Sequence, residues 1–552
     1  MGNVTQKDRG DGGEQRPLIV GKAVPYSADG ASPDDWTDAP TDHASSIADE
    51  DSKKSLNEQI REFFYPSNCP PQCQLFRRRN LAIPICYLVV GTVQGLFRTF
   101  LNVYPIDLGA TEAQQTTFST ISSLPAAFKL LYGFVTDNVP ILGYRRKPYV
   151  FLGWFFSSFV MATLWSVSDL TLTRDQETGK AIAPLNAPSM LLLSLSFFGY
   201  GFGMWFADAT ADALVAEKAR DEPLATRGSL QSTCYTLRFF GQMVAAPLST
   251  YFYSHIGPQF IVQCLCVIPC VMFPLTVFLY EERFFLIKST QDQCKEIWKT
   301  VCSRSVWEPM SFVYLFNIFQ VSNAAWREFL YTVLGFTASQ LNSLLVASYV
   351  LLYAGTMSYK YFLLQASWRR IYQACILLNS FLSLLQLMLI RGKTLGLSPF
   401  LFALGDDAFA EFLSGVQFLP LGIMMMALCP PGSEGASYAM FSTVWNSAMM
   451  LAPAISSLLL GIWDVSRDAM LQGNFDGLFN LTLLTTALNA APIFIIGWLP
   501  HGREDMEALD HKAGSGSAIG GGFFLLVLFA SMFWTLAVAM MNILHPGWAG
   551  GS

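Results

Sequence analysis

The stretch Gly201 to Arg220, GFGMWFADATADALVAEKAR, decides the fold, because it is an apolar run interrupted by two acids. Asp208 and Asp212 are four residues apart, so in a helix they share one face. Inside a bilayer each ionised carboxylate costs roughly a few kcal/mol unless it is paired or hydrated. The stretch therefore predicts a membrane helix whose acids need partners from other helices.

The composition of the whole chain supports a membrane protein. Of its 552 residues 52% are hydrophobic and only 14% are charged, and the sequence holds 44 Phe and 13 Trp. Apolar stretches recur from Asn80 to Leu544, and each has the roughly 20 residues that cross a hydrocarbon core of about 30 Å. The fold class is thus predicted to be an all-α membrane protein. The sequence has no nucleic-acid-binding motif, so no nucleic-acid partner is predicted.

The apolar stretches divide the chain into twelve predicted spans and one more. The predicted spans are 80–104, 115–137, 148–169, 189–216, 228–254, 258–281, 307–333, 338–363, 369–390, 400–429, 435–463, 476–500 and 522–544. We expect two six-helix bundles, 80–281 and 307–500, around a central cytosolic loop, 282–306. A linker, 501–521, leads to the additional hydrophobic helix, 522–544. Residues 1–72 are rich in Asp, Ser, Gly and Pro and are expected to form a disordered cytosolic tail.

The distribution of basic residues predicts how the chain is oriented. Lys and Arg gather in the even-numbered connections, with Arg145, Arg146, Lys218 and Arg220 among them. By the positive-inside rule these connections and the N-terminus face the cytosol. The segment Glu14 to Ile19 resembles an acidic dileucine sorting signal. The expected location is therefore the plasma membrane or an endosomal or vacuolar membrane.

Four intramembrane charges fall at matching depths in neighbouring spans. Counted at 1.5 Å per residue from the charged end of span four, Asp208 lies about 15 Å deep and Asp212 about 9 Å. The same count puts Lys129 of span two at about 12 Å and Arg238 of span five at about 14 Å. Two acids and two bases are therefore expected in one layer.

This charged layer has two interpretations. In the functional one, Asp208 or Asp212 carries a coupling proton, while Arg238 and Lys129 bind an anionic substrate or hold the acids in its absence. In the other, the four side chains form a static ion-pair network that holds the bundle together. All five His residues fall in tails, loops or span ends, and no metal-ligand spacing or catalytic triad is present. Neither an enzyme nor a metal or other cofactor is predicted.

Three stretches carry a family resemblance. They are Lys129 to Tyr149, KLLYGFVTDNVPILGYRRKPY, then Asp212 to Arg220, DALVAEKAR, and Leu428 to Gly435, LCPPGSEG. Together they resemble the folate-biopterin transporter family, a branch of the major facilitator superfamily. The resemblance covers about 80 to 500 and leaves out the acidic tail and the thirteenth span.

The resemblance implies secondary active transport of folates, pterins or related organic anions, coupled to protons, by alternating access of two bundles. The implied partners are a small folate-like or pterin-like anion, protons and the lipid bilayer, with no inference on oligomeric state. A gating role is implied for Asp137, Arg145, Arg146, Glu217, Arg220 and Glu434. For Glu434 an ordinary helix cap is an equal alternative.

Two other functions stay open on the sequence. The same fold could carry another cofactor-like, nucleoside-derived or amino-acid-derived substrate, because the motif does not fix the cargo. Alternatively, the chain could be a membrane receptor or scaffold that does not transport. The charged layer argues against the second possibility, since buried charges are costly to keep without a function.

Overall fold

The computed structural model describes most of the chain beyond the N-terminal tail, and Glu62–Ser552 form one compact unit. The described residues are 65, 70–71, 73–110, 118, 121–174, 181–182, 184–223, 228–283, 290–323, 325–336, 338–394, 396–429, 434–502, 505 and 516–544. The expected tail, 1–72, therefore lies outside the described residues apart from positions 65, 70 and 71. The turn 430–433 and most of the linker 501–521 also lie outside them.

The first six predicted spans correspond to a group of helices that we call the N-terminal bundle. It consists of α3 (Ala82–Asp107), η1 (Leu124–Phe128) leading into α5 (Lys129–Asn138), α6 (Lys147–Val167), α7 (Met190–Ala219), α8 (Ser229–His255), and α9 (Pro258–Val267) continued by η2 (Ile268–Val271) and α10 (Met272–Phe278). A hairpin of β1 (Thr173–Arg174) and β2 (Ala181–Ile182) joins α6 to α7. Pro125 and Pro269 lie in the two 3-10 segments, where a missing backbone N–H is tolerated.

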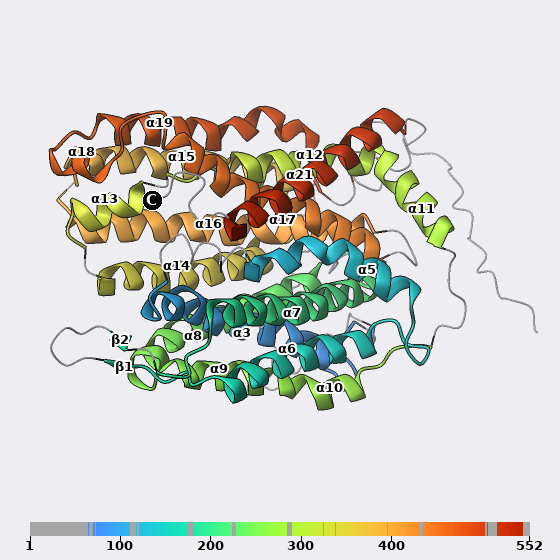
Figure 1. Cartoon of the computed structure of the whole chain (residues 1–552). Coiled ribbons are helices and arrows are strands. Elements are labelled where there is room, and N and C mark those ends of the chain that lie inside the picture. The colour runs from blue at the N-terminus through green and yellow to red at the C-terminus, as the bar shows by residue number, and fades with distance from the viewer. Residues whose placement is uncertain are drawn as a thin grey trace, which may run out of the picture. The chain divides into compact units, whose positions relative to one another are not determined.

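The next six predicted spans correspond to the C-terminal bundle. It consists of α12 (Arg304–Phe319), α13 (Trp326–Thr332), α14 (Ala338–Ser358) with η3 (Tyr359–Leu363), α15 (Trp368–Ile390), α16 (Pro399–Ala427), α17 (Glu434–Leu459), α18 (Arg467–Leu471), and α19 (Asp476–Ala490) with η4 (Ala491–Trp498). In Figure 1 these helices, drawn in yellow to red, lie on one side, and those of the N-terminal bundle, drawn in blue to green, lie on the other.

Span seven is not the continuous helix, 307–333, that the apolar run predicts. α12 ends at Phe319 and α13 begins at Trp326. Between them the Asn323 side chain accepts a hydrogen bond from the Ala325 N–H, and its carbonyl accepts one from the Trp326 N–H. A side chain that satisfies the backbone locally competes with the helix and starts a new one.

Two helices lie outside the twelve-span pattern. α11 (Thr290–Cys302) occupies the predicted central loop, and α21 (Ala518–Leu544) corresponds to the thirteenth span. On α11 the buried residues Gln293, Ile297 and Val301 recur every four positions, so one face packs and the rest is exposed. α21 contacts α11, α12 and α17 and runs obliquely across α12 and α17 in Figure 1.

Seven helical segments within the described residues are long and apolar enough to cross a membrane by length and composition. They are Ala82–Asp107, Lys147–Val167, Met190–Ala219, Pro258–Phe278, Trp368–Ile390, Pro399–Ala427 and Asp476–Trp498. The two bundles meet where α5 packs on α17 and where α8 packs on α14. Arg98 of α3 also donates a hydrogen bond to the Tyr349 hydroxyl of α14. This packing positions the buried charges described next.

Candidate functional site

The four charges predicted to share a layer meet inside the N-terminal bundle, and we call them the charge cluster. Lys129 Nζ at the start of α5 lies 2.7 Å from Asp208 Oδ2 and 3.5 Å from Asp212 Oδ2 on α7. Arg238 Nη1 of α8 lies 3.0 Å from Asp208 Oδ1. Asp208 and Asp212 are each only 1% exposed. Because the two acids and two bases balance, the cluster avoids an uncompensated buried charge.

The two acids have different neighbours. Asp208 contacts both bases, whereas Asp212 accepts a hydrogen bond of 2.6 Å from the Tyr87 hydroxyl of α3 and one of 3.5 Å from the Tyr235 hydroxyl of α8. The Trp205 ring lies next to the bases, 4.8 Å from Lys129 Nζ to the ring centroid. An aromatic face beside a cation stabilises it further.

A chain of hydroxyl groups extends from the charge cluster into the C-terminal bundle. The Tyr235 hydroxyl lies 3.4 Å from the Tyr438 hydroxyl of α17, which also accepts a 3.1 Å hydrogen bond from Gln231 Nε2. Tyr438 is one helical turn beyond Glu434, the first residue of α17. The environment of Asp212 is therefore connected to the helix that begins at Glu434.

A second group of charges, which we call the arginine cluster, lies at the end of the bundles where α5 ends and α6 begins. Its centre is Arg146, which is completely buried. Arg146 Nη2 lies 2.6 Å from both Asp137 Oδ1 and Glu217 Oε1. Burial by itself lowers the pKa of the Arg146 guanidinium, but Glu217 and Asp137 outweigh this effect and raise the pKa above its ordinary value. Arg146 is therefore held permanently in its charged form.

The arginine cluster joins the two bundles. Arg145 Nη2 lies 3.0 Å from Asp137 Oδ1 and 3.8 Å from Glu434 Oε2. Arg220 Nη1 lies 2.5 Å from Glu434 Oε1. The second oxygen of Asp137 accepts a 2.7 Å hydrogen bond from the backbone N–H of Ala436 in the first turn of α17, where an anion is favourable.

The close approach of α5 and α17 depends on two glycines. A Cβ atom on Gly133 would lie 2.4 Å from the backbone oxygen of Gly435, and one on Gly435 would lie 2.6 Å from Asp137 Oδ1. Neither position has room for a larger residue without a shift of the helices. The ends of α5 and α17 that carry the arginine cluster are thus closed on each other.

Three residues of this region were not singled out by the sequence. Glu281 accepts hydrogen bonds of 2.7–2.8 Å from the backbone N–H groups of Arg145, Arg146 and Lys147, at the start of α6. Gln293 of α11 donates to Asp137 Oδ2 and accepts from the Asn138 side chain. An acid directly after span six was a possible signal for Glu281, but Gln293 in a polar segment offered none.

All ten site residues predicted from the sequence fall into these two clusters. The charge cluster holds Lys129, Asp208, Asp212 and Arg238, and the arginine cluster holds Asp137, Arg145, Arg146, Glu217, Arg220 and Glu434. The sequence missed Tyr87, Gln231 and Tyr438, since aromatic and amide side chains in a span usually pack or bond locally. Among the described residues, no three or more His, Cys, Asp or Glu side chains form a group that could hold a metal ion.

Known proteins resemble this chain in sequence and in fold. The profile of the BT1 family matches residues 91–517. The folate-biopterin transporter of Synechocystis sp. is 26% identical over 442 residues, which cover 78% of this chain and 84% of that protein. Folate transporter 2 of Plasmodium falciparum is 23% identical over 391 residues, covering 70% of this chain and 80% of that protein.

Among solved structures, the human organic anion transporter MFSD10 superposes with a TM-score of 0.54 at 13% sequence identity, covering 77% of this chain and all of that one. This similarity confirms the predicted fold of the major facilitator superfamily. The family match extends over more than half of the chain, including both clusters. The chain therefore belongs to the BT1 family, and it is a multi-pass membrane transporter of the major facilitator superfamily rather than an enzyme.

Proposed function

We propose that this protein is a proton-coupled secondary transporter of folates, pterins or related organic anions. The observation that carries the proposal is the buried charge cluster, in which two bases are held by two acids inside the membrane-spanning region. The names of the relatives from Synechocystis and Plasmodium falciparum support the substrate class. Buried charges within a membrane protein are typical of substrate and proton pathways.

Charge balance explains why an anion would need a proton. The formal charges of the cluster cancel, so an anion that enters it brings uncompensated negative charge into a region of low dielectric. Protonation of one acid removes one negative charge and releases a base to bind the substrate. Binding of the anion and of a proton therefore favour each other, as reciprocal coupling requires.

The neighbours of each acid suggest a role for it. Asp208 contacts both Lys129 and Arg238, so we assign it the task of holding these bases while no substrate is bound. Asp212 accepts hydrogen bonds from two tyrosines and lies farther from Lys129, so it can accept a proton without breaking the Asp208 pairs. Arg238 and Lys129 then bind the carboxylates of the substrate, with Arg238 able to do so through two parallel hydrogen bonds.

The arginine cluster is proposed to be the gate on the cytosolic side. The excess of Lys and Arg in the even-numbered connections supports this orientation. Opening toward the cytosol requires α5 to separate from α17, which breaks the Asp137 contact with Ala436 and the Arg220–Glu434 pair. The two bundles then rock about the charge cluster, giving alternating access.

Helix α17 links the two clusters in this mechanism. Its first residue, Glu434, belongs to the gate, and Tyr438 one turn later contacts Tyr235, which bonds to Asp212. Protonation of Asp212 weakens the hydrogen bonds that it accepts. We infer that substrate and proton binding loosen the contact of α17 with the N-terminal bundle and so favour opening of the gate.

The test is uptake of labelled folate and labelled biopterin into vesicles that contain the purified full-length protein, with an imposed pH gradient. An acidic exterior is expected to stimulate uptake of at least one of the two compounds, and excess unlabelled folate or pterin is expected to compete. Competition by nucleoside or amino-acid derivatives alone would change the assigned cargo. Absence of uptake of every compound at every gradient would contradict transport of this class.

A further inference from the structure

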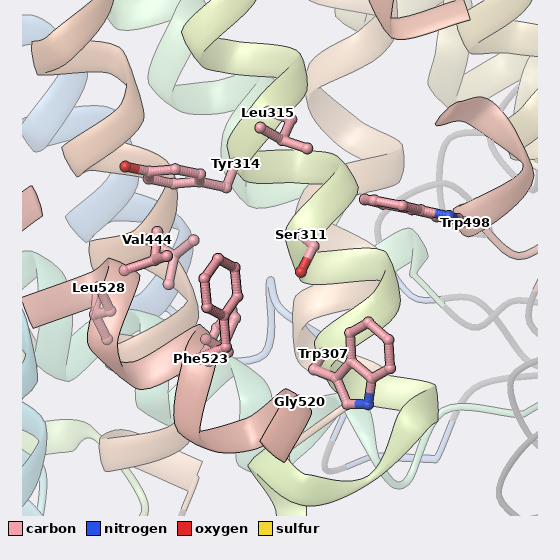
Figure 2. Close-up of a pocket in the computed structure, with 11 residues that line it drawn as sticks. Trp307, Ser311, Tyr314, Leu315, Val444, Trp498, Gly520, Phe523 and Leu528 are labelled. Atoms are coloured by element: carbon pink, nitrogen blue, oxygen red, sulfur yellow. The ribbon is translucent and has the colours of Figure 1, made fainter. Parts of the chain in front are cut away.

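A groove lined mostly by apolar side chains lies beneath α21, away from both charge clusters. Its volume is 250 Å³, and it is lined by Trp307, Ser311, Tyr314, Leu315, Val444, Trp498, Gly520, Phe523, Phe524, Val527 and Leu528. Figure 2 shows Trp307 and Gly520 together at one end and Tyr314 with Leu315 at the other. The lining comes from α12, α17, η4 and α21, so the groove exists because the extra helix covers the C-terminal bundle.

The docking of α21 explains why the groove is not filled. A Cβ atom on Gly521 would lie 2.9 Å from Cys302 Sγ, and one on Gly520 would lie 3.0 Å from the Trp307 ring. Glycines thus let the first turn of α21 pack directly against the end of α11 and the start of α12. Beyond them Phe523 and Phe524 stand between α21 and the bundle, and the oblique course of α21 leaves space between the helices (Figure 1).

The groove is continuous with a surface that only lipid would cover. Phe523 lines the groove and is nonetheless 66% exposed, and its neighbour Leu526 is 65% exposed. Because the chain spans a membrane, apolar side chains on this face contact hydrocarbon. An apolar groove open to that face is filled by hydrocarbon more favourably than by water, which would find few polar partners there.

The length and the ends of the groove match one chain of a phospholipid. From Trp307 to Tyr314 the groove extends about 10 Å along α12, which is within the roughly 15 Å of one leaflet of the hydrocarbon core. Trp307 and Trp498 line it, and tryptophan is typical of the level where acyl chains meet headgroups. Lys299 and Arg304 are exposed near the Trp307 end, where they can attract a phosphate.

The Trp307 end of the groove also has an open hydrogen-bonding position. The Trp307 indole N–H is buried and has no hydrogen-bond partner within the described part of the chain. An ester carbonyl between the headgroup and the acyl chain would supply the missing acceptor.

We propose that this groove binds one acyl chain of a membrane phospholipid, with the headgroup at the Trp307 end, and that α21 serves as a cover for this lipid site. A bound chain would fill the space between α21 and α12 and stabilise the position of the thirteenth helix. The site is separate from the proposed transport mechanism and does not depend on it.

The proposal is tested with a phosphatidylcholine that carries a photoreactive diazirine in its acyl chain, using the purified full-length protein in nanodiscs. Irradiation of the wild type should label peptides of α12 and α21. Val527→Trp fills the groove, and Leu526→Trp, its neighbour on the exposed face of the same helix, is the matched control. The labelling of the α12 peptide should disappear in V527W and persist in L526W, while thermal unfolding confirms that both variants are folded.

Three outcomes would overturn the proposal. Equal labelling of α12 in V527W and the wild type would mean that the label does not come from the groove. Loss of labelling in both variants would mean that any bulky change on α21 prevents lipid contact, without a specific site. Displacement of the label by cholesterol but not by unlabelled phospholipid would assign the groove to a sterol instead.

Discussion

At the scale of single residues, the two acids of α7 differ in what a proton would change. Asp208 lies 2.7 Å from Lys129 and 3.0 Å from Arg238, so protonating it would leave two bases without their partner. Asp212 lies 3.5 Å from Lys129 and mainly accepts hydrogen bonds from Tyr87 and Tyr235. A proton on Asp212 therefore disturbs fewer ionic contacts, which is why we assign the coupling role to it.

The first prediction concerns Asp212→Asn. The amide has the shape of the acid and still accepts a hydrogen bond from Tyr87, so the fold should persist, but it cannot take up a proton. Uptake of labelled substrate should no longer rise when the exterior is acidified. Asp169→Asn, an exposed acid at the end of α6, is the control and should keep the wild-type dependence. Acid stimulation that survives in D212N would move the coupling role to another residue.

The second prediction separates stability from transport at Arg238. Arg238→Gln leaves the buried Asp208 with one base instead of two, so the free energy of unfolding should fall by about 3 kcal/mol. The double variant Asp208→Asn with Arg238→Gln removes both charges and should recover most of this loss. Neither variant should transport, because the substrate needs Arg238. Recovery of uptake together with stability in the double variant would reduce the pair to a structural ion pair.

How far the sequence predicts the site depends on the kind of residue. A charge within an apolar span is conspicuous, and counting residues from the span ends was enough to predict that Lys129, Asp208, Asp212 and Arg238 share a layer. The structure brings them into contact. Tyr87 and Tyr438 could not be predicted in this way, since a tyrosine in a span is usually packed and its partner becomes visible only when helices are placed side by side.

At the scale of elements, the contact of α5 with α17 should set the state of the gate. The third prediction is that Gly133→Ala forces these helices apart, because its Cβ would lie 2.4 Å from the Gly435 oxygen. The reporter is Ser437→Cys, a buried position on α17, in a chain whose exposed Cys294 is replaced by Ser. Its reaction with a maleimide should become faster. Gly405→Ala adds the same methyl group where nothing lies within 4 Å, and an equal increase there would refute the assignment.

The fourth prediction concerns α11 as a support of the closed gate. Gln293→Ala removes the hydrogen bonds to Asp137 and Asn138, a loss of about 1 kcal/mol, or roughly fivefold in the population of the open state. The same cysteine reporter should therefore react faster, though less so than with Gly133→Ala. Gln291→Ala, an exposed position on α11, should have no effect. An unchanged rate in Q293A would mean that α11 does not stabilise the gate.

The elements that the sequence missed are those stabilised by contacts between distant segments. The apolar runs predict membrane helices, because a span must satisfy its own backbone hydrogen bonds. α11 is short and polar, and it forms in the predicted loop because Gln293, Ile297 and Val301 are buried. The break in span seven depends on a local cap at Asn323, which an average over a hydrophobic run does not register.

At the scale of the whole molecule, the two clusters lie at successive levels of the same helix pair. On α7 only five residues separate Asp212 from Glu217, a rise of about 8 Å, and α17 carries Glu434 and Tyr438 one turn apart. A change at the charge cluster can therefore reach the gate through two rigid helices. This arrangement is what a transporter needs if it is to open its inner gate only when substrate and proton are bound.

The central claim, that the charge cluster moves an anion together with a proton, is tested by placing a pH-sensitive dye inside proteoliposomes that contain the full-length protein. With no imposed pH gradient, an inward gradient of folate or biopterin should acidify the lumen as labelled substrate enters. In D212N any substrate entry should leave the luminal pH unchanged. Accumulation of labelled substrate by the wild type without acidification of the lumen would contradict the account.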